Sequence, residues 1–190
     1  DYKSLKFLIL GGHTKNIDKV GSLTGLETLY LNSIKKISIS FINNLKELKT
    51  LRFILGGREN IQEIDKNIIE NLEITRVRGF KDLGNISSFK NLKTLSIEDN
   101  IKLEELDFNV EFPNLTDLKI INCKSFSSLS GLSNLSSLKS LVIYKTDLNF
   151  DTVIKNSVPQ NLETFVFCTT RNKEDKVIKD RISELGYETR

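Results

Sequence analysis

A short leucine-rich block recurs along the chain and limits what it can fold into. The block has the form LxxLxL, where x is any residue, and it occurs eight times at intervals of 20 to 24 residues. The anchoring residues are Leu5, Leu8, Leu10; Leu26, Leu29, Leu31; Leu48, Leu51, Phe53; Leu72, Thr75, Val77; Leu92, Leu95, Ile97; Leu115, Leu118, Ile120; Leu138, Leu141, Ile143; and Leu162, Phe165, Phe167. Because so short a repeat cannot enclose a core alone, we expect the repeats to stack.

Each block ends in two apolar residues separated by one position, which is the spacing of side chains on one face of a β-strand. The next stretch, of about 10 to 15 residues, carries apolar positions at looser spacing, such as Phe126, Leu129 and Leu132. We therefore expect every repeat to form a strand and a return arc around a shared interior. The chain contains no alanine, which argues against a helical bundle.

The fourth block fits the pattern least well. Thr75 stands where an inward leucine belongs, and an alternative reading of the same segment turns Ile74 inward instead. A slip of one residue exchanges the two faces of a strand, so the side-chain assignments from Glu73 to Arg78 depend on which reading holds.

The segment LTDLKIINCKSF, from Leu115 to Phe126, resembles the leucine-rich-repeat consensus LxxLxLxxNxL, with Cys123 at the Asn/Cys position. The likeness covers almost the whole chain, and the repeat length is similar to that of bacterial, internalin-like repeats. The resemblance implies an α/β solenoid: a horseshoe of about eight repeats with a concave parallel β-sheet and an irregular or short-helical convex side. Because His13 and Ile34 occupy the Asn position in other repeats, we do not expect an unbroken asparagine ladder.

We interpret the chain as one domain, with eight repeats in residues 1–170 and a C-terminal capping helix in residues 171–190. Val177, Ile178, Ile182 and Leu185 have helical spacing, and Gly186 is a typical helix end. The alternative is a partner-binding helix. No comparable segment precedes Leu5, so either the first repeat caps itself or a preceding segment is missing.

Two glycine pairs each follow an expected strand. They are Gly11-Gly12 and Gly56-Gly57, and they favour turns with positive φ. A phosphate-binding loop is the alternative, but neither pair leads into GK[ST] or a third glycine.

The residue types most used in catalysis are scarce. His13 is the single histidine, and Cys123 and Cys168 are the two cysteines. Five stacked repeats at about 4.8 Å each separate His13 from Cys123 by roughly 24 Å, far beyond hydrogen-bond reach. The same scarcity excludes a zinc site, and two repeats separate the cysteines too widely for a disulfide. We therefore expect no enzyme activity, no catalytic residue, no metal and no cofactor.

The charge balance gives little reason to expect polyanionic partners. The chain has 28 basic and 25 acidic residues, for a net charge of +3, so we expect no nucleic-acid partner. It also lacks a long apolar run, and its N-terminus does not resemble a signal peptide, so we expect no membrane partner. The compartment, whether cytoplasm or the exterior after signal removal, stays open, and we expect a monomer.

Alternation along the strands predicts which side chains point away from the core onto the concave sheet. Many of them are aromatic, aliphatic or basic, the types enriched at protein interfaces. We predict a partner-binding surface formed by Tyr30, Arg52, Ile54, Arg76, Arg78, Glu98, Lys119, Ile121 and Tyr144. The gathered arginines favour a protein partner with an acidic surface, unless nearby acids such as Glu73 and Glu98 neutralise them.

Two functions follow as hypotheses. The first, implied by the resemblance, is a non-enzymatic protein-protein interaction module whose concave sheet binds a protein, with an inhibitor or immunity-type protein as one version. The second is a structural or surface-display fragment of a longer protein whose N-terminal part is missing. The absence of an initiator methionine before Asp1 motivates the second hypothesis.

Overall fold

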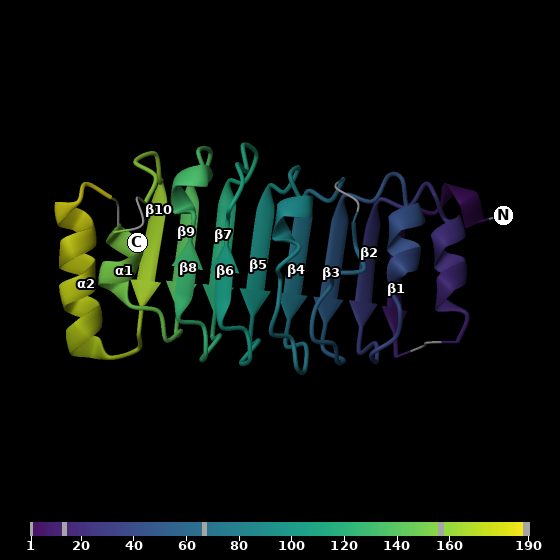
Figure 1. The fold of residues 1–190 in the computed structure, drawn as a ribbon, viewed down its shortest axis with the longest axis horizontal. Coiled ribbons are helices and arrows are strands. Elements are labelled where there is room, and N and C mark those ends of the chain that lie inside the picture. Colours follow the sequence, from purple (N-terminus) through teal and green to yellow (C-terminus); the bar gives the residue numbers. More distant parts are fainter. Residues whose placement is uncertain (1, 13–14, 66–67, 156–157, 188–190) are drawn as a thin grey trace.

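The computed structural model describes residues 2–12, 15–65, 68–155 and 158–187, so His13 lies outside the described residues. An eight-stranded, entirely parallel sheet forms one side of the molecule, and its strands lie side by side in chain order (Figure 1). Its strands are β1 (Phe7–Gly11), β2 (Thr28–Asn32), β3 (Thr50–Ile54), β4 (Asn71–Thr75), β5 (Thr94–Glu98), β7 (Asp117–Ile121), β9 (Ser140–Tyr144) and β10 (Thr164–Cys168).

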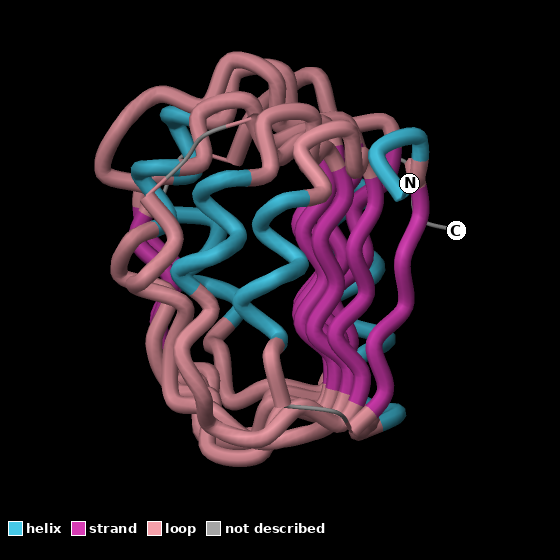
Figure 2. The backbone as a smooth tube through the Cα atoms, turned by 90° about the vertical axis from the view of Figure 1, so that its right-hand side faces the viewer, coloured by secondary structure: helices cyan, strands magenta, loops and turns pink. Residues whose placement is uncertain are grey.

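The return arcs lie on the other side and are short or irregular, as predicted. Figure 2 shows the strands stacked behind one another, with helical turns and loops closing the interior across from them. The 3-10 turns are Tyr2–Ser4, Ile17–Ser22, Ser40–Asn44, Ile86–Ser88 and Leu132–Asn134. Two arcs pair as a small parallel sheet, β6 (Glu105–Asp107) with β8 (Ser128–Ser130), and one contains the helix α1 (Phe150–Lys155).

The strands are in register, so equivalent core residues form continuous rows. Leu29, Leu51 and Leu72 pair in sequence, and the row continues through Leu95 and on to β10. These leucines are at most 1% exposed. Because the repeats stack in register, the repeat before and the repeat after cover each leucine side chain from two sides. The expected solenoid of eight repeats around one core is confirmed.

The fourth repeat differs from the prediction. Its strand begins at Asn71 and pairs Leu72 with Leu51 and Ile74 with Phe53. The inward anchors are therefore Ile69, Leu72 and Ile74, all at most 1% exposed, in place of the predicted Leu72, Thr75 and Val77. Thr75 is the last strand residue and faces outward, and Val77 is buried in the turn after the strand.

This register also corrects the placement of two predicted site residues. Arg76 and Arg78 follow β4, so they lie at its carboxyl edge and not on the outer face of the sheet. Glu73 takes the outward position between Arg52 of β3 and Ser96 of β5. The segment NLEITRV allows both assignments because Leu72 is followed by an apolar residue two positions later, Ile74, and by another five positions later, Val77.

A left-handed residue follows most strands of the large sheet and turns the chain out of it. The backbone N–H at this position donates to the carbonyl of the last strand residue in the next repeat, as Ser33 does to Ile54 at 2.8 Å and Arg76 to Glu98 at 2.8 Å. Residues in this position, with φ between 53° and 65°, are Gly12, Ser33, Leu55, Arg76, Asp99, Asn122 and Lys145. The positive φ expected at Gly12 and at Gly56 (φ 78°) is confirmed.

Two neighbouring repeats share a hydrogen-bond pattern just beyond these left-handed residues. The buried Asn100 amide donates to the carbonyls of Ile74 and Glu98, at 2.6 and 2.9 Å. Cys123 occupies the same position one repeat later, and its thiol donates to the carbonyls of Ile97 and Ile121, at 3.8 and 3.5 Å. Cys123 is fully buried, as expected, and the ladder does not run through the whole chain.

A C-terminal helix, α2 (Asn172–Glu184), covers the last repeat (Figure 1). Ile178 and Ile182 are buried, whereas Val177 is 57% and Leu185 is 45% exposed. Two of the four predicted capping residues therefore contact the core and two do not. Tyr187, beyond the helix, is buried, and the centroid of its ring lies 5.5 Å from that of Phe165.

Candidate functional site

Four side chains form a continuous row across the outer face of β1 to β4. The Phe7 and Tyr30 rings meet edge to face with centroids 5.1 Å apart, and the Arg52 guanidinium lies 4.6 Å from the Tyr30 centroid. Arg52 also pairs with Glu73 at 3.1 Å. We call Phe7, Tyr30, Arg52 and Glu73 the aromatic row.

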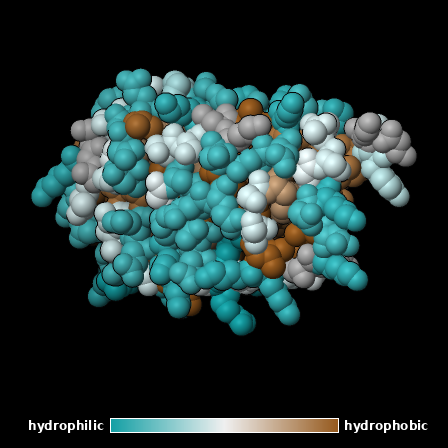
Figure 3. Space-filling model, turned by 45° about the vertical axis from the view of Figure 1, so that its right-hand side comes forward, coloured by the Kyte–Doolittle hydropathy of each residue, from teal (hydrophilic) through white to brown (hydrophobic). Residues whose placement is uncertain are grey.

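The aromatic row lines a shallow hollow of about 410 Å³ on the sheet. Small polar side chains complete its wall, among them Thr28, Thr50 and Ser96. Phe7 is 49% exposed, and its neighbour on β1, Ile9, is 53% exposed. Figure 3 views the other side of the molecule, the return arcs and the N-terminal end, and shows a small group of hydrophobic atoms toward that end among mostly hydrophilic ones. An exposed apolar group beside a preorganised arginine is suited to contact another protein.

The rest of the predicted surface is spread along the sheet. Ile54, Glu98, Ile121 and Tyr144 lie in one row of outward positions on β3, β5, β7 and β9, and Lys119 lies in the next row. Tyr144 is 39% exposed. The sheet brings these five residues onto the same face as Tyr30 and Arg52.

Charge on this face is locally balanced. The Arg52 guanidinium is paired with Glu73, and Asp117 and Glu98 lie on the strands that carry or neighbour Lys119. The neutralisation by Glu73 that the sequence left open is therefore observed, whereas Glu98 makes no ion pair within the described residues. The predicted gathering of cations on the sheet face is wrong, because Arg76 and Arg78 lie elsewhere.

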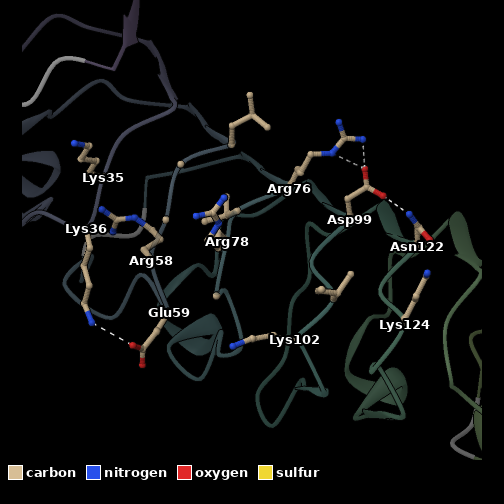
Figure 4. Close-up of a pocket in the computed structure, with 16 residues that line it drawn as sticks. Lys35, Lys36, Arg58, Glu59, Arg76, Arg78, Asp99, Lys102, Asn122 and Lys124 are labelled. Atoms are coloured by element: carbon tan, nitrogen blue, oxygen red, sulfur yellow. Dashed lines mark hydrogen bonds and ion pairs between the residues drawn. The ribbon is translucent and has the colours of Figure 1, made fainter.

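Arg76 and Arg78 line a larger hollow at the carboxyl edge of the strands, of about 1030 Å³ (Figure 4). We call it the rim groove. It is formed by the turns that follow β2, β3, β4, β5 and β7. Three glycines, Gly56, Gly57 and Gly79, contribute backbone to its lining. Its basic side chains are Lys35, Lys36, Arg58, Arg76, Arg78, Lys102 and Lys124, and its acidic ones are Glu59 and Asp99.

The two acids of the rim groove are already engaged. Glu59 pairs with Lys36 and with Lys81 outside the groove, both at 3.2 Å. Asp99 pairs with Arg76 at 2.6 Å and accepts a hydrogen bond from the Asn122 amide. The Asn122 hydrogen bond and the Arg76 guanidinium lower the pKa of the Asp99 carboxyl.

The side chains that commonly bind metals do not gather among the described residues. These residues contain no group of three or more His, Cys, Asp or Glu side chains that could hold a metal ion. Burial raises the pKa of the Cys123 thiol to about 11, which leaves it a poor nucleophile. Both cysteines are free thiols. No helix in the described part of the chain is long and apolar enough to cross a membrane.

The arrangement of these repeats matches solved structures although the sequence does not match known families. A scan against family models and a sequence search of curated proteins find no match. A leucine-rich-repeat protein of Leptospira interrogans aligns over 99% of this chain with a TM-score of 0.50 and 21% identity. This chain has the leucine-rich-repeat fold.

The leucine-rich-repeat chain spans 61% of the length of the Leptospira protein. An internalin of Listeria monocytogenes aligns over 98% of this chain and 80% of its own, with 18% identity and a TM-score of 0.28. At 21% identity the Leptospira comparison shows the fold alone, so a binding surface has to be argued from this chain's own residues.

Sequence reasoning missed two features of the leucine-rich-repeat surface. Phe7 faces outward on the first strand, but the register pairs it with Thr28 and pairs Tyr30 with Ile9, so its diagonal contact with Tyr30 is decided by how the two rings pack. The rim groove could not be predicted from the sequence either, because it depends on how far each turn projects beyond its strand.

Proposed function

We propose that this chain is a non-enzymatic protein-binding module whose partner docks on the sheet face, centred on the aromatic row. The observation that carries the proposal is the exposed Phe7-Tyr30-Arg52 contact. Aromatic and arginine side chains contribute most of the binding energy at protein interfaces, particularly when neighbours hold them in place. Leucine-rich-repeat folds are suited to this role because a regular sheet presents a long continuous surface.

The row is held in its conformation before any partner arrives. Tyr30 lies between the Phe7 ring and the Arg52 guanidinium, and Glu73 fixes the other end of that guanidinium. Binding therefore costs little additional side-chain entropy. The paired arginine can still donate its remaining N–H groups to a partner's carboxylate or carbonyl.

Site-specific photo-cross-linking tests where a partner docks. A benzoylphenylalanine replaces Ser96, on the sheet face, or Ser127, on a return arc, and the protein is incubated with extract of the source cells. We expect one polypeptide to cross-link from position 96 and not from position 127. Excess wild-type protein without the cross-linker, added before irradiation, should compete for this polypeptide and suppress the cross-link. A folded Tyr30→Ala/Arg52→Ala variant should not suppress it.

Calorimetry with the identified, purified polypeptide then measures the contribution of the row. Tyr30→Ala should weaken binding by about 2 kcal/mol or more, roughly 30-fold. The control, Thr164→Ala, is on the same face but six strands away, at about 29 Å, and should leave the affinity unchanged. Equal cross-linking from positions 96 and 127, or suppression of the cross-link by the variant as strong as by wild type, would count against docking on the aromatic row. It would favour a structural or surface-display role instead.

A further inference from the structure

The rim groove has an excess of positive charge that the described residues do not neutralise. Ion pairs engage Lys36 and Arg76, but Lys35, Arg78 and Lys102 have no acidic partner within 4 Å in the described ranges. The same holds for Arg58 and Lys124. Five cations of the described lining therefore face one hollow without an ion pair of their own, and their potentials add there.

Arg58 is unusual among these cations because its side chain is buried. The residue is 6% exposed, its guanidinium lies 5.1 Å from the Phe53 ring centroid, and one N–H donates to the Ile37 carbonyl at 3.2 Å. Burial lowers the pKa of this guanidinium, with Glu63 acting in the opposite sense. A buried cation that lacks a carboxylate partner is poorly solvated, so an anion placed beside it gains a strong interaction.

The groove also presents aliphatic side chains. Ile101 is 58% exposed and Leu55 is 40% exposed. Leu55 has φ 60°, a left-handed conformation that is unfavourable for leucine by about 1–2 kcal/mol, and this turn directs it into the groove wall. Two exposed aliphatic groups between cations favour a ligand that carries both carboxylates and apolar side chains.

The dimensions fit an extended peptide. The lining runs from the turn after β2 to the turn after β7, which is four strand spacings or about 19 Å. A peptide in extended conformation covers that distance with about six residues. The described lining holds no aromatic side chain, so it offers no stacking platform of the kind used to bind single-stranded nucleic acids.

We propose that the rim groove is a second binding site, for an extended acidic segment of a protein in which carboxylates alternate with aliphatic residues. Arg58, Arg78 and Lys102 bind the carboxylates, and Leu55 and Ile101 pack against the aliphatic side chains. The site lies at the strand edge and is separate from the aromatic row, so it does not depend on the function proposed above.

Fluorescence anisotropy with labelled eight-residue peptides tests the site on the full chain. The probe has four glutamates alternating with four aliphatic residues, and it is compared with its glutamine version, with octaglutamate and with an oligothymidylate of eight nucleotides. We expect the probe to bind most tightly, octaglutamate at least fivefold more weakly, and the glutamine version not detectably. Binding should weaken with added salt.

Matched charge reversals locate the site. Arg78→Glu/Lys102→Glu should weaken binding of the probe at least tenfold. Lys46→Glu/Lys90→Glu changes the net charge equally, but these exposed lysines precede β3 and β5 at the opposite edge of the sheet, so affinity should change less than twofold. Tyr30→Ala/Arg52→Ala should also leave it unchanged. Circular dichroism confirms that each variant is folded.

A third variant separates the aliphatic contribution from charge. Leu55→Ser/Ile101→Ser should weaken binding of the probe about fivefold and leave octaglutamate binding unchanged. Equal losses in both charge-reversal pairs, or no detectable binding of the probe, would overturn the proposal. Tighter binding of the oligothymidylate with the same dependence on Arg78 and Lys102 would instead assign the groove to nucleic acid.

Discussion

Arg76 and Asp99 occupy the same left-handed position in consecutive repeats, with φ of 53° and 57°. The Arg76 guanidinium donates two hydrogen bonds to one oxygen of Asp99, at 2.6 and 3.1 Å. The aligned repeats bring these residues together although 23 positions separate them in sequence. The pair holds Arg76 along the wall of the rim groove, away from the sheet face.

The Asp99 pair should make stability depend on pH in the acid range. The Asn122 hydrogen bond and Arg76 lower the pKa of Asp99 below its ordinary value of 3.8, so the folded state binds this proton less tightly than the unfolded state. The contribution is complete above about pH 4 and is lost as pH falls through the folded pKa. Asp99→Asn should cost about 1 kcal/mol at pH 7, because the arginine is largely exposed, and the difference should vanish at lower pH.

Urea unfolding of wild type and Asp99→Asn between pH 7 and pH 2 measures this difference. Asp147→Asn, at an exposed aspartate, is the control and should track wild type throughout. If the free energies of unfolding of wild type and Asp99→Asn differ by the same amount down to pH 2, the difference does not come from the ionised Asp99 carboxylate.

Cys123 should behave as an inert thiol until strongly alkaline pH. With a pKa of about 11, only about one thiol in a thousand is ionised at pH 8, and the side chain is buried. Because burial raises the pKa of the Cys123 thiol in the folded state, its contribution to stability is complete below the ordinary thiol pKa of 9 and falls as pH rises toward 11. Mass spectrometry after brief treatment with a thiol reagent should find label on the partly exposed Cys168 first. Prior labelling of Cys123 in folded protein would be inconsistent with its burial.

Gly131 should tolerate no side chain. Its φ is 73°, and an added Cβ would lie 2.1 Å from the Phe108 carbonyl oxygen in the preceding arc. Gly131→Ala therefore combines an unfavourable φ with a backbone clash and should lower the free energy of unfolding by about 3 kcal/mol or more. Gly12→Ala, at φ 65° with open space around the Cβ, should cost only about 1–2 kcal/mol. Chemical denaturation of both variants measures the difference, and equal losses would show that the arcs move apart easily.

The C-terminal cap should depend on only one side of α2. Ile182 is 2% exposed, so Ile182→Asp buries a charge against the last repeat and should cost about 3 kcal/mol or more. Val177 is 57% exposed, so Val177→Asp should change stability by less than about 0.5 kcal/mol. Thermal melts of both variants, beside a truncation after Arg171 that uncovers Phe165, test the cap. A truncated chain that melts and dissolves like wild type would show that α2 does not cap the core.

The candidate site was predictable only in part. Tyr30, Arg52, Ile54, Lys119 and Tyr144 face outward as their spacing indicated, because alternation along a strand fixes its two faces. Arg58, the buried cation of the rim groove, gave no signal in the sequence. Its burial depends on Phe53 and on the Ile37 carbonyl, which belong to other segments of the stacked turns.

The sequence by itself determined the repeat, the strand in each copy, the buried leucine rows and the helix at the C-terminus. These follow from local spacing, because each repeat buries the same positions against its neighbours. The tertiary structure decided the register of the fourth repeat. Apolar residues follow Leu72 at both Ile74 and Val77, and pairing with β3 and β5 places Leu72 and Ile74 in the inward rows of the strand. That choice moved Arg76 and Arg78 from the sheet face to the rim groove.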